Sequence, residues 1–300
     1  MSNSSEIPTL RALLGDYPNT ASLRKGVIRS PRFNLNFADV KVPNHAFKRV
    51  VRDIEFDVAE LAIATYLTAK AHGKPLVLLP VVVRGKFQHE SIVYNADRNQ
   101  LAPSDLAGRR VGIRAHSVTT VAWVRGILQN DYGVDLDRVK WITFEDAHVA
   151  EVTDPATFER APAGKNPMTM LLEGELDAAV LTGKDLKHPS VKYLIPDHEA
   201  AEQAWYQRYQ AVPINHMVTV KESVLKSNPW VAEEIFRLLA ESKKAAGLPA
   251  GAGPDPFPFG VEANRKSLEL VIKYAFQQKL IPRAYSVDEL FNDVTRVLGR

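Results

Sequence analysis

The stretch DLAGRRVGIRAHSVTTVAWVRGIL, residues 105–128, decides the fold class of this chain. Its apolar run Val111–Arg114 predicts a buried strand, and Val118–Leu128 then follows helical spacing. A second stretch, LLEGELDAAVLT at residues 171–182, contains another short apolar run at Asp177–Leu181. Strands that alternate with helices are typical of α/β proteins, so these stretches predict an α/β fold.

The same alternation extends along the chain. Further strands are predicted at residues 10–14, 33–37, 57–61, 76–83, 92–94, 139–143 and 214–220. Helical spacing recurs at 231–239, where we expect Asn228 to cap the helix and Pro229 to open it, and again at 268–276. Residues 247–260, GLPAGAGPDPFPFG, form a loop by composition. This order predicts mostly parallel central sheets.

Composition limits the protein class. The chain has 300 residues, enough for two lobes with separate cores, and its net charge of +3 is too small to indicate a nucleic-acid or membrane partner. It contains no cysteine, which excludes disulfides, thiolate nucleophiles and cysteine-type zinc sites. The N-terminal residues lack the basic start and apolar stretch of a secretory signal. We therefore expect a cytoplasmic protein, and a removed export signal stays open as the alternative.

Several segments resemble one known family. They are FDVAELAIATYL (56–67), PVVVRGKFQHESIVYN (80–95), WVRGILQNDYGV (123–134), PINHMVTVKESVLKSNPWVAEEIF (213–236) and PFGVEANRKSLELVIKYAFQQKLIPRAYSVDELF (258–291). In this order they resemble the 4,5-dihydroxyphthalate decarboxylase family, and residues 105–128 with 171–182 resemble the second lobe of a type 2 periplasmic-binding-protein fold. The chain departs from the family pattern at His116, where an aromatic residue is usual, and in shorter connections at 146–166 and 245–258.

The resemblance implies a two-lobed α/β fold that holds its ligand in an inter-lobe cleft. We expect lobe I to contain residues 1–107 and 214–300, and lobe II to contain residues 108–213. The chemistry implied is decarboxylation of a hydroxylated aromatic dicarboxylate. Such a reaction needs a base for a phenol, an acid for the ring carbon that bears the departing carboxylate, and cations for the other carboxylate.

Three residues are the catalytic candidates. His89 and His216 have side chains that exchange protons near neutral pH, and Glu60 is an acid inside an apolar strand, where burial would raise its pKa. Other interpretations stay open: an exposed loop histidine for His89, a hydrogen-bonded core histidine for His216, and an arginine partner for Glu60. Which histidine would be acid and which base is also open.

A larger set is predicted to bind the substrate. These residues are Asp16, Arg84, His116, Ser117, Thr119, Thr120, Arg125, Thr182 and Arg265. Arginines can bind carboxylates in a bidentate way, and backbone N–H groups at a helix start attract anions. Asp16 follows the first strand and could bind a ring hydroxyl. Surface ion pairing, helix packing and capping are the alternative roles of Arg84, Arg125 and Arg265.

No organic cofactor is required for this chemistry, and we expect none. A divalent metal at His89, His216 and Glu60 has suitable ligand types but no close ligand spacing, so we do not favour it. The chain also lacks a Walker loop, a GxGxxG fingerprint, a GxSxG elbow and an HExxH motif.

The resemblance to the family therefore implies a decarboxylase that converts 4,5-dihydroxyphthalate to protocatechuate and CO2 through a keto intermediate. Its partner would be a small anionic aromatic substrate, with no nucleic acid and no membrane, and a homo-oligomer is compatible with this prediction. The alternative is a solute-binding protein that delivers an anionic aromatic or carboxylate ligand to an ABC-type transporter.

Overall fold

A computed structural model describes residues 7–300, and the chain folds into two compact units. Of the described residues, the first unit contains 7–85, Ile214–Glu269 and Tyr285–Arg300. The second unit contains Lys86–Pro213 and Leu270–Ala284. The predicted lobes, residues 1–107 with 214–300 and residues 108–213, stay a prediction; the compact units place residues 86–107 and 270–284 in the second unit. Residues 86–107 fall in the second unit because they contain a strand of its sheet.

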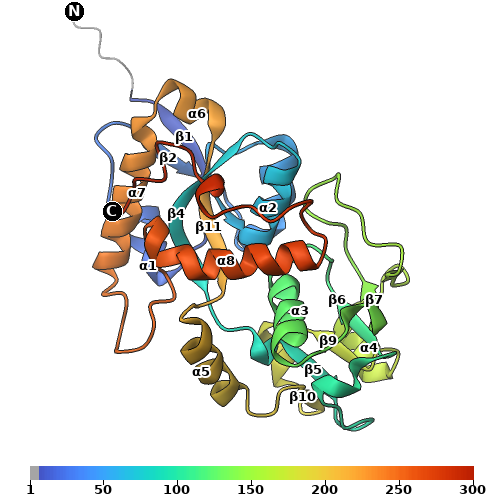
Figure 1. Ribbon diagram of the computed structural model, residues 1–300. Helices are drawn as coiled ribbons and strands as arrows, with labels where there is room; N and C mark the ends of the chain where they lie inside the picture. Colours follow the sequence, from blue (N-terminus) through green and yellow to red (C-terminus); the bar gives the residue numbers. More distant parts are fainter. Residues whose placement is uncertain (1–6) are drawn as a thin grey trace, which may run out of the picture. The chain divides into compact units, whose positions relative to one another are not determined.

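The first unit is built on a five-stranded mixed sheet (Figure 1). Its strands are β1 (Thr9–Leu13), β2 (Asn34–Phe37), β3 (Val58–Ala62), β4 (Leu76–Gly85) and β11 (Ile214–Lys221), in the order β2-β1-β3-β11-β4. Strand β1 runs parallel to β2 and β3, and β11 runs antiparallel to both of its neighbours. The sheet is therefore mixed rather than mostly parallel, because β11 enters it from the far part of the chain.

Helices complete the first unit. They are α1 (Pro18–Arg24), α2 (Ile63–Ala71), α6 (Glu222–Ser227), α7 (Trp230–Ala245) and the first part of α8 (Val261–Gln277). Helix α1 packs against α7, and Ile235 and Leu238 of α7 join Val218 and Leu79 of the sheet in one buried cluster. Each such aliphatic side chain contributes about 1.5–3 kcal/mol when fully buried. Pro229, rather than Asn228, occupies the N-cap position of α7.

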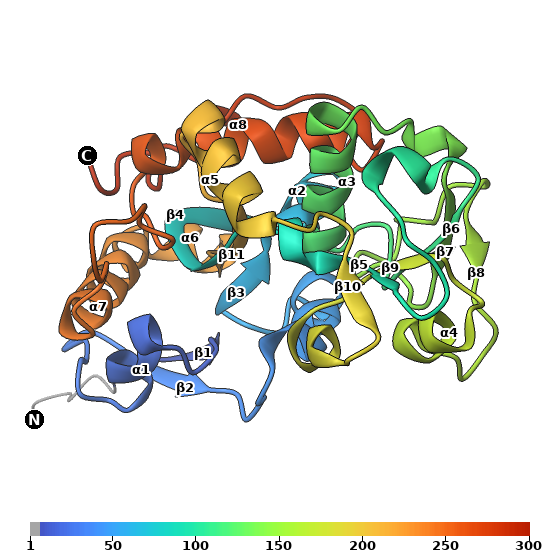
Figure 2. The ribbon, with the colours of Figure 1, turned by 90° about the horizontal axis from the view of Figure 1, so that it is seen from below.

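The second unit contains a six-stranded sheet, seen in Figure 2. Its strands are β5 (Ile92–Asn95), β6 (Arg110–Ile113), β7 (Lys140–Thr143), β8 (Glu159–Arg160), β9 (Ala178–Val180) and β10 (Val191–Tyr193), in the order β10-β5-β9-β6-β7-β8. Strands β9, β6, β7 and β8 are parallel, and β5 is antiparallel to β9 and β10. The helices are α3 (Thr119–Asp131), α4 (Pro167–Glu173), α5 (His198–Tyr209) and the last part of α8.

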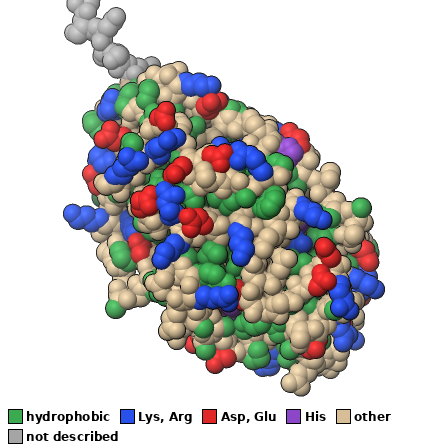
Figure 3. All heavy atoms as spheres, viewed as in Figure 1, with side chains coloured by type: hydrophobic (Ala, Val, Ile, Leu, Met, Phe, Trp, Pro, Cys, Tyr) green, Lys and Arg blue, Asp and Glu red, His purple; other side chains and the backbone are tan. Residues whose placement is uncertain are grey.

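Surface properties agree with the modest net charge. On the face shown in Figure 3, basic and acidic side chains of the described residues are interspersed. Among residues 7–300, no helix is long and apolar enough to cross a membrane.

Candidate active site

Polar side chains gather at one edge of the first unit's sheet, where β1, β3 and β4 have their carboxyl ends. Glu60 comes from β3, and Arg84 stands near the end of β4. Strand β11 runs the opposite way, so its beginning lies at this same edge, and His216 pairs with Ala62 on one side and with Arg84 on the other. Open α/β sheets bind their ligands at the carboxyl ends of parallel strands, which makes this edge the candidate site.

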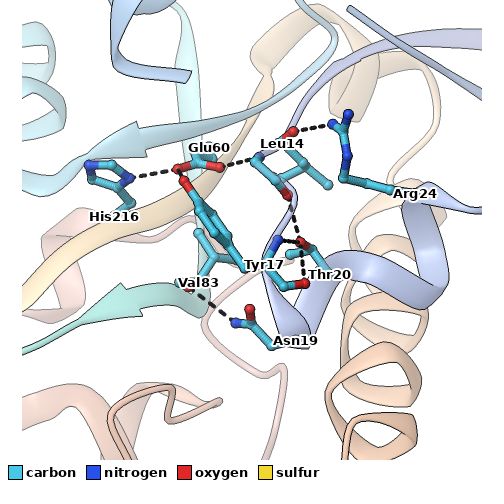
Figure 4. Close-up of polar contacts among 9 residues, drawn as sticks. Leu14, Tyr17, Asn19, Thr20, Arg24, Glu60, Val83 and His216 are labelled. Atoms are coloured by element: carbon cyan, nitrogen blue, oxygen red, sulfur yellow. Dashed lines mark hydrogen bonds and ion pairs between the residues drawn. The ribbon is translucent and has the colours of Figure 1, made fainter. Parts of the chain in front are cut away.

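Glu60 is the centre of the site. Its side chain is fully buried, yet three donors surround the carboxylate. Oε2 accepts a hydrogen bond from the Gly15 N–H at 2.6 Å, and Oε1 accepts one from the Tyr17 hydroxyl at 2.7 Å. The same Oε1 lies 2.6 Å from Nδ1 of His216, as Figure 4 shows. Three hydrogen bonds to a buried carboxyl group offset much of the cost of its burial, which explains an acid in an apolar strand.

His216 is oriented by that carboxylate. An ionised carboxylate only accepts hydrogen bonds, so we assign the imidazole hydrogen to Nδ1. Nε2 then carries the lone pair, and it has no hydrogen-bond partner among residues 7–300. The ring is 9% exposed, and the Phe47 ring meets it edge-on at 5.1 Å between centroids. The geometry leaves Nε2 as a proton acceptor and places a negative charge beside the imidazolium that forms.

The loop after β1 holds Tyr17 against Glu60. The Tyr17 ring covers Gly15 so closely that a Cβ at that position would lie 2.2 Å from Cζ of the ring. The Tyr17 N–H donates to Oγ1 of Thr20, whose hydroxyl in turn donates to the Gly15 carbonyl at 2.6 Å. Burial, and then the Glu60 carboxylate, raise the pKa of Tyr17, so it stays a neutral phenol that donates to Glu60.

Arg84 supplies the positive charge of the site. Its guanidinium carbon lies 5.3 Å from the centre of the Tyr17 ring, while the residue as a whole is exposed. Asn19 fixes the neighbouring backbone, because its Nδ2 donates to the Val83 carbonyl at 3.1 Å. The cation is thus held beside the Glu60 network with its outer face available to an anion.

The structure therefore brings together three of the predicted residues, Glu60, Arg84 and His216. Sequence reasoning assigned no role to Tyr17, Gly15 or Asn19. The available signal was their position, because GDYPN directly follows the first strand and such a connection opens onto the sheet edge. Asp16 lies in the same loop and is exposed.

His89 lies in the second unit and outside this network. It begins a short 3₁₀ turn, is 2% exposed, and packs its ring against Trp205 at 6.2 Å. Burial, with a smaller contribution from His198, lowers the pKa of His89 to about 4. The imidazole is therefore neutral at pH 7.

This burial makes a prediction about acid stability. Unfolded histidine takes up a proton near pH 6.5, whereas folded His89 does so only near pH 4, so the folded state loses stability as pH falls through this window. The loss amounts to about 3 kcal/mol for this group. Urea unfolding at pH 7 and pH 4.5 should show a smaller acid loss in His89→Gln than in the wild type. The exposed His72→Gln serves as control, and an equal acid loss in all three proteins would contradict the prediction.

Other predicted residues of the second unit surround the start of α3. His116 and Ser117 are buried before the helix, Thr119 is its first residue, and Thr120 is partly exposed. Arg125 is buried further along the same helix, and Thr182 is exposed after β9.

Arg265 belongs to the first unit and is already paired. Its guanidinium donates to Glu262 at 2.6 Å and to Asp288 at 3.1 Å, so we leave it outside the site. Among residues 7–300, no group of three histidine or acidic side chains is arranged to hold a metal ion.

Comparison with solved structures defines the fold class. The alkanesulfonate-binding protein SsuA from Xanthomonas axonopodis pv. citri superposes with a TM-score of 0.62 at 13% identity, over 96% of this chain and 99% of that one. The desulfurization enzyme DSZB superposes with a TM-score of 0.57 at 14% identity, over 96% and 97%. The fold is that of the periplasmic binding proteins, and it serves both a binding protein and an enzyme.

Sequence comparison defines the family. No family model matches the chain. A 4,5-dihydroxyphthalate decarboxylase from Comamonas testosteroni is 30% identical over 79% of this chain and 75% of its own length. A second from Pseudomonas putida is 30% identical over 66% of this chain and 81% of its own length. The chain belongs to the 4,5-dihydroxyphthalate decarboxylase family.

Proposed function

We propose that this protein is a carboxy-lyase that converts 4,5-dihydroxyphthalate to protocatechuate and CO2. The observation that carries the proposal is the buried Glu60–His216 pair with a free Nε2, because a receptor that only binds its ligand has no need for an oriented proton acceptor. The family relatives named as decarboxylases support the same activity.

The reaction follows from the needs of the ring. Nε2 of His216 removes the proton of the hydroxyl para to the departing carboxylate, and the phenolate electrons move into the ring. The ring carbon that bears the carboxylate takes up a proton and becomes a non-aromatic keto intermediate. The C–C bond then breaks, CO2 leaves without the bonding electrons, and these electrons restore the aromatic ring as a phenolate. The phenolate takes back the proton from Nε2 of His216. One proton is consumed for each CO2 released.

Each residue of the site has a part in this scheme. Glu60 stabilises the imidazolium of His216 and holds its orientation, which is worth most in a buried site. Tyr17 keeps Glu60 in place, and Arg84 binds the carboxylate that stays on the ring. The catalytic role predicted for His89 in proton transfer, as acid or as base, stays a prediction, as does a mechanism without metal or organic cofactor.

One experiment tests the function directly. Purified protein mixed with 4,5-dihydroxyphthalate should release CO2 and change the ultraviolet spectrum of the ring to that of protocatechuate. A ligand-dependent rise in melting temperature without any CO2 would instead indicate a solute-binding protein.

Arg84 offers a test of substrate binding. Arg84→Met should raise KM for 4,5-dihydroxyphthalate about 10–100-fold with a smaller effect on kcat, because a charge-assisted bidentate contact contributes about 1.5–3 kcal/mol. Steady-state kinetics measures both constants. Arg138→Met, at an exposed position of the second unit, is the control. An unchanged KM in Arg84→Met would mean that this arginine faces only solvent.

A further inference from the structure

Arg125 is a buried cation without a counter-charge. It is 5% exposed, and among residues 7–300 no carboxylate forms an ion pair with it. Its Nε and Nη1 atoms are fully buried and unbonded. The guanidinium carbon lies 4.8 Å from the centre of the Trp141 ring and 5.1 Å from that of Phe158. These rings stabilise the positive charge but offer no acceptor for its N–H groups.

Without a bound ligand, this arrangement lowers the stability of the folded protein. Burial lowers the pKa of Arg125 to about 9, which still leaves it charged at neutral pH. Asp137, the carboxylate that acts on it, is exposed and beyond ion-pair distance. An unpaired buried ion and its unmade hydrogen bonds both oppose folding. A bound anion would remove both costs.

His116 provides a second unsatisfied group beside the first. Its Nε2 lies 3.1 Å from the Gln278 carbonyl, which only accepts, so Nε2 carries the hydrogen and Nδ1 carries a lone pair. Nδ1 is buried without a partner. The His116 ring contacts the Phe158 ring at 5.0 Å between centroids, so the Phe158 side chain packs against both His116 and Arg125. Burial and the nearby Arg125 lower the pKa of His116 to about 3, which keeps it a neutral acceptor.

We propose that Arg125 and His116 form a binding site for a small oxyanion that also carries an O–H group. The guanidinium donates to the charged oxygens, and Nδ1 of His116 accepts from the hydroxyl. Hydrogen phosphate and a short hydroxycarboxylate share this chemistry. The site consists of residues of the second unit alone and does not depend on the decarboxylase function.

Melting temperature with matched anions tests the proposal. At pH 7 and constant ionic strength, phosphate should raise the melting temperature in a saturable way, because a ligand that binds only the folded state stabilises it. Sulfate has a similar shape and no O–H at this pH, so its half-saturating concentration should be about tenfold higher or more. Glycolate compared with acetate is the second arm. Whichever of phosphate and glycolate saturates the response at the lower concentration identifies the class of anion that the site binds.

Variants assign the effect to these residues. Arg125→Met should abolish the response to phosphate, whatever its own melting temperature, and the exposed Arg138→Met should retain it. His116→Phe should remove the preference for phosphate over sulfate. If Arg125→Met does not fold, wild-type protein that contains ¹⁵N-labelled histidine is titrated with phosphate instead. The ring nitrogen resonances of His116 in the NMR spectrum should then shift.

Three results would overturn the site. They are no response of the wild type to phosphate or glycolate, equal responses to phosphate and sulfate, and a phosphate response that survives Arg125→Met but is lost in Arg84→Met. The last would place the anion at the candidate active site.

Discussion

Replacing His216 with asparagine should lower kcat for 4,5-dihydroxyphthalate by about 10²–10⁴, the usual contribution of a positioned acid or base. Asparagine can still hydrogen-bond to Glu60, but it has no group that accepts a proton near neutral pH. KM should change little, because Arg84 and the rest of the sheet edge remain. Initial rates of CO2 release over a range of substrate concentrations measure both constants.

The control for this variant is His45→Asn, an exposed histidine of the same unit. Its kcat should equal that of the wild type. The assignment of His216 fails if His216→Asn retains the wild-type kcat while its circular dichroism shows a folded protein. A loss of activity together with a large loss of structure would instead mean that the fold fails because Glu60 has lost its hydrogen-bond partner. The midpoint of urea unfolding distinguishes this outcome from a loss of activity in a folded protein.

Replacing Glu60 with glutamine should cost about 1–3 kcal/mol of folding free energy, as expected when a buried donor is left without its hydrogen-bond acceptor. The carboxylate accepts from three donors, the Gly15 N–H, the Tyr17 hydroxyl and Nδ1 of His216. A glutamine amide has only one acceptor atom, so its NH2 group must face at least one of these donors. Urea unfolding at pH 7 measures the loss, and kcat should fall as well because the imidazolium loses its counter-charge.

Glu262→Gln is the matched control for Glu60. It has the same change of side chain in the same unit, but its ion pair with Arg265 is on the surface, where the Glu262 side chain is 76% exposed. Such pairs contribute about 0–1 kcal/mol. If both variants unfold at the same urea concentration, Glu60 is not the structural centre of the site.

Periodicity predicted the longer elements of both units. Strands such as β4 and β11, and helices such as α3 and α7, have many residues that repeat one pattern. Strand β8 was missed because it contains only two residues, too few for any pattern. Strand β10 was missed because Lys192 interrupts its three residues, whereas β9, which is equally short, lies in an apolar run. The course of β11 was also not predictable, since its antiparallel pairing depends on contacts between residues far apart in the chain.

Residue types were informative about the site only in part. An acid in the apolar run FDVAELAI is unusual, and Glu60 stood out for that reason. His89 and His216 were equally good candidates by residue type, and local sequence could not separate them. The structure separates them by their neighbours, since His216 meets a carboxylate and His89 meets the Trp205 ring.

The sequence by itself determined the α/β class, the family resemblance and the presence of proton-exchanging and cationic side chains, because these depend on residue type and on spacing within short segments. The tertiary structure decided which of those side chains act together. Glu60 and His216 are 156 residues apart, and only the antiparallel register of β3 and β11 brings Oε1 within 2.6 Å of Nδ1. Local propensity carries no information about a contact of that separation, because the contact depends on how the strands are ordered in the sheet.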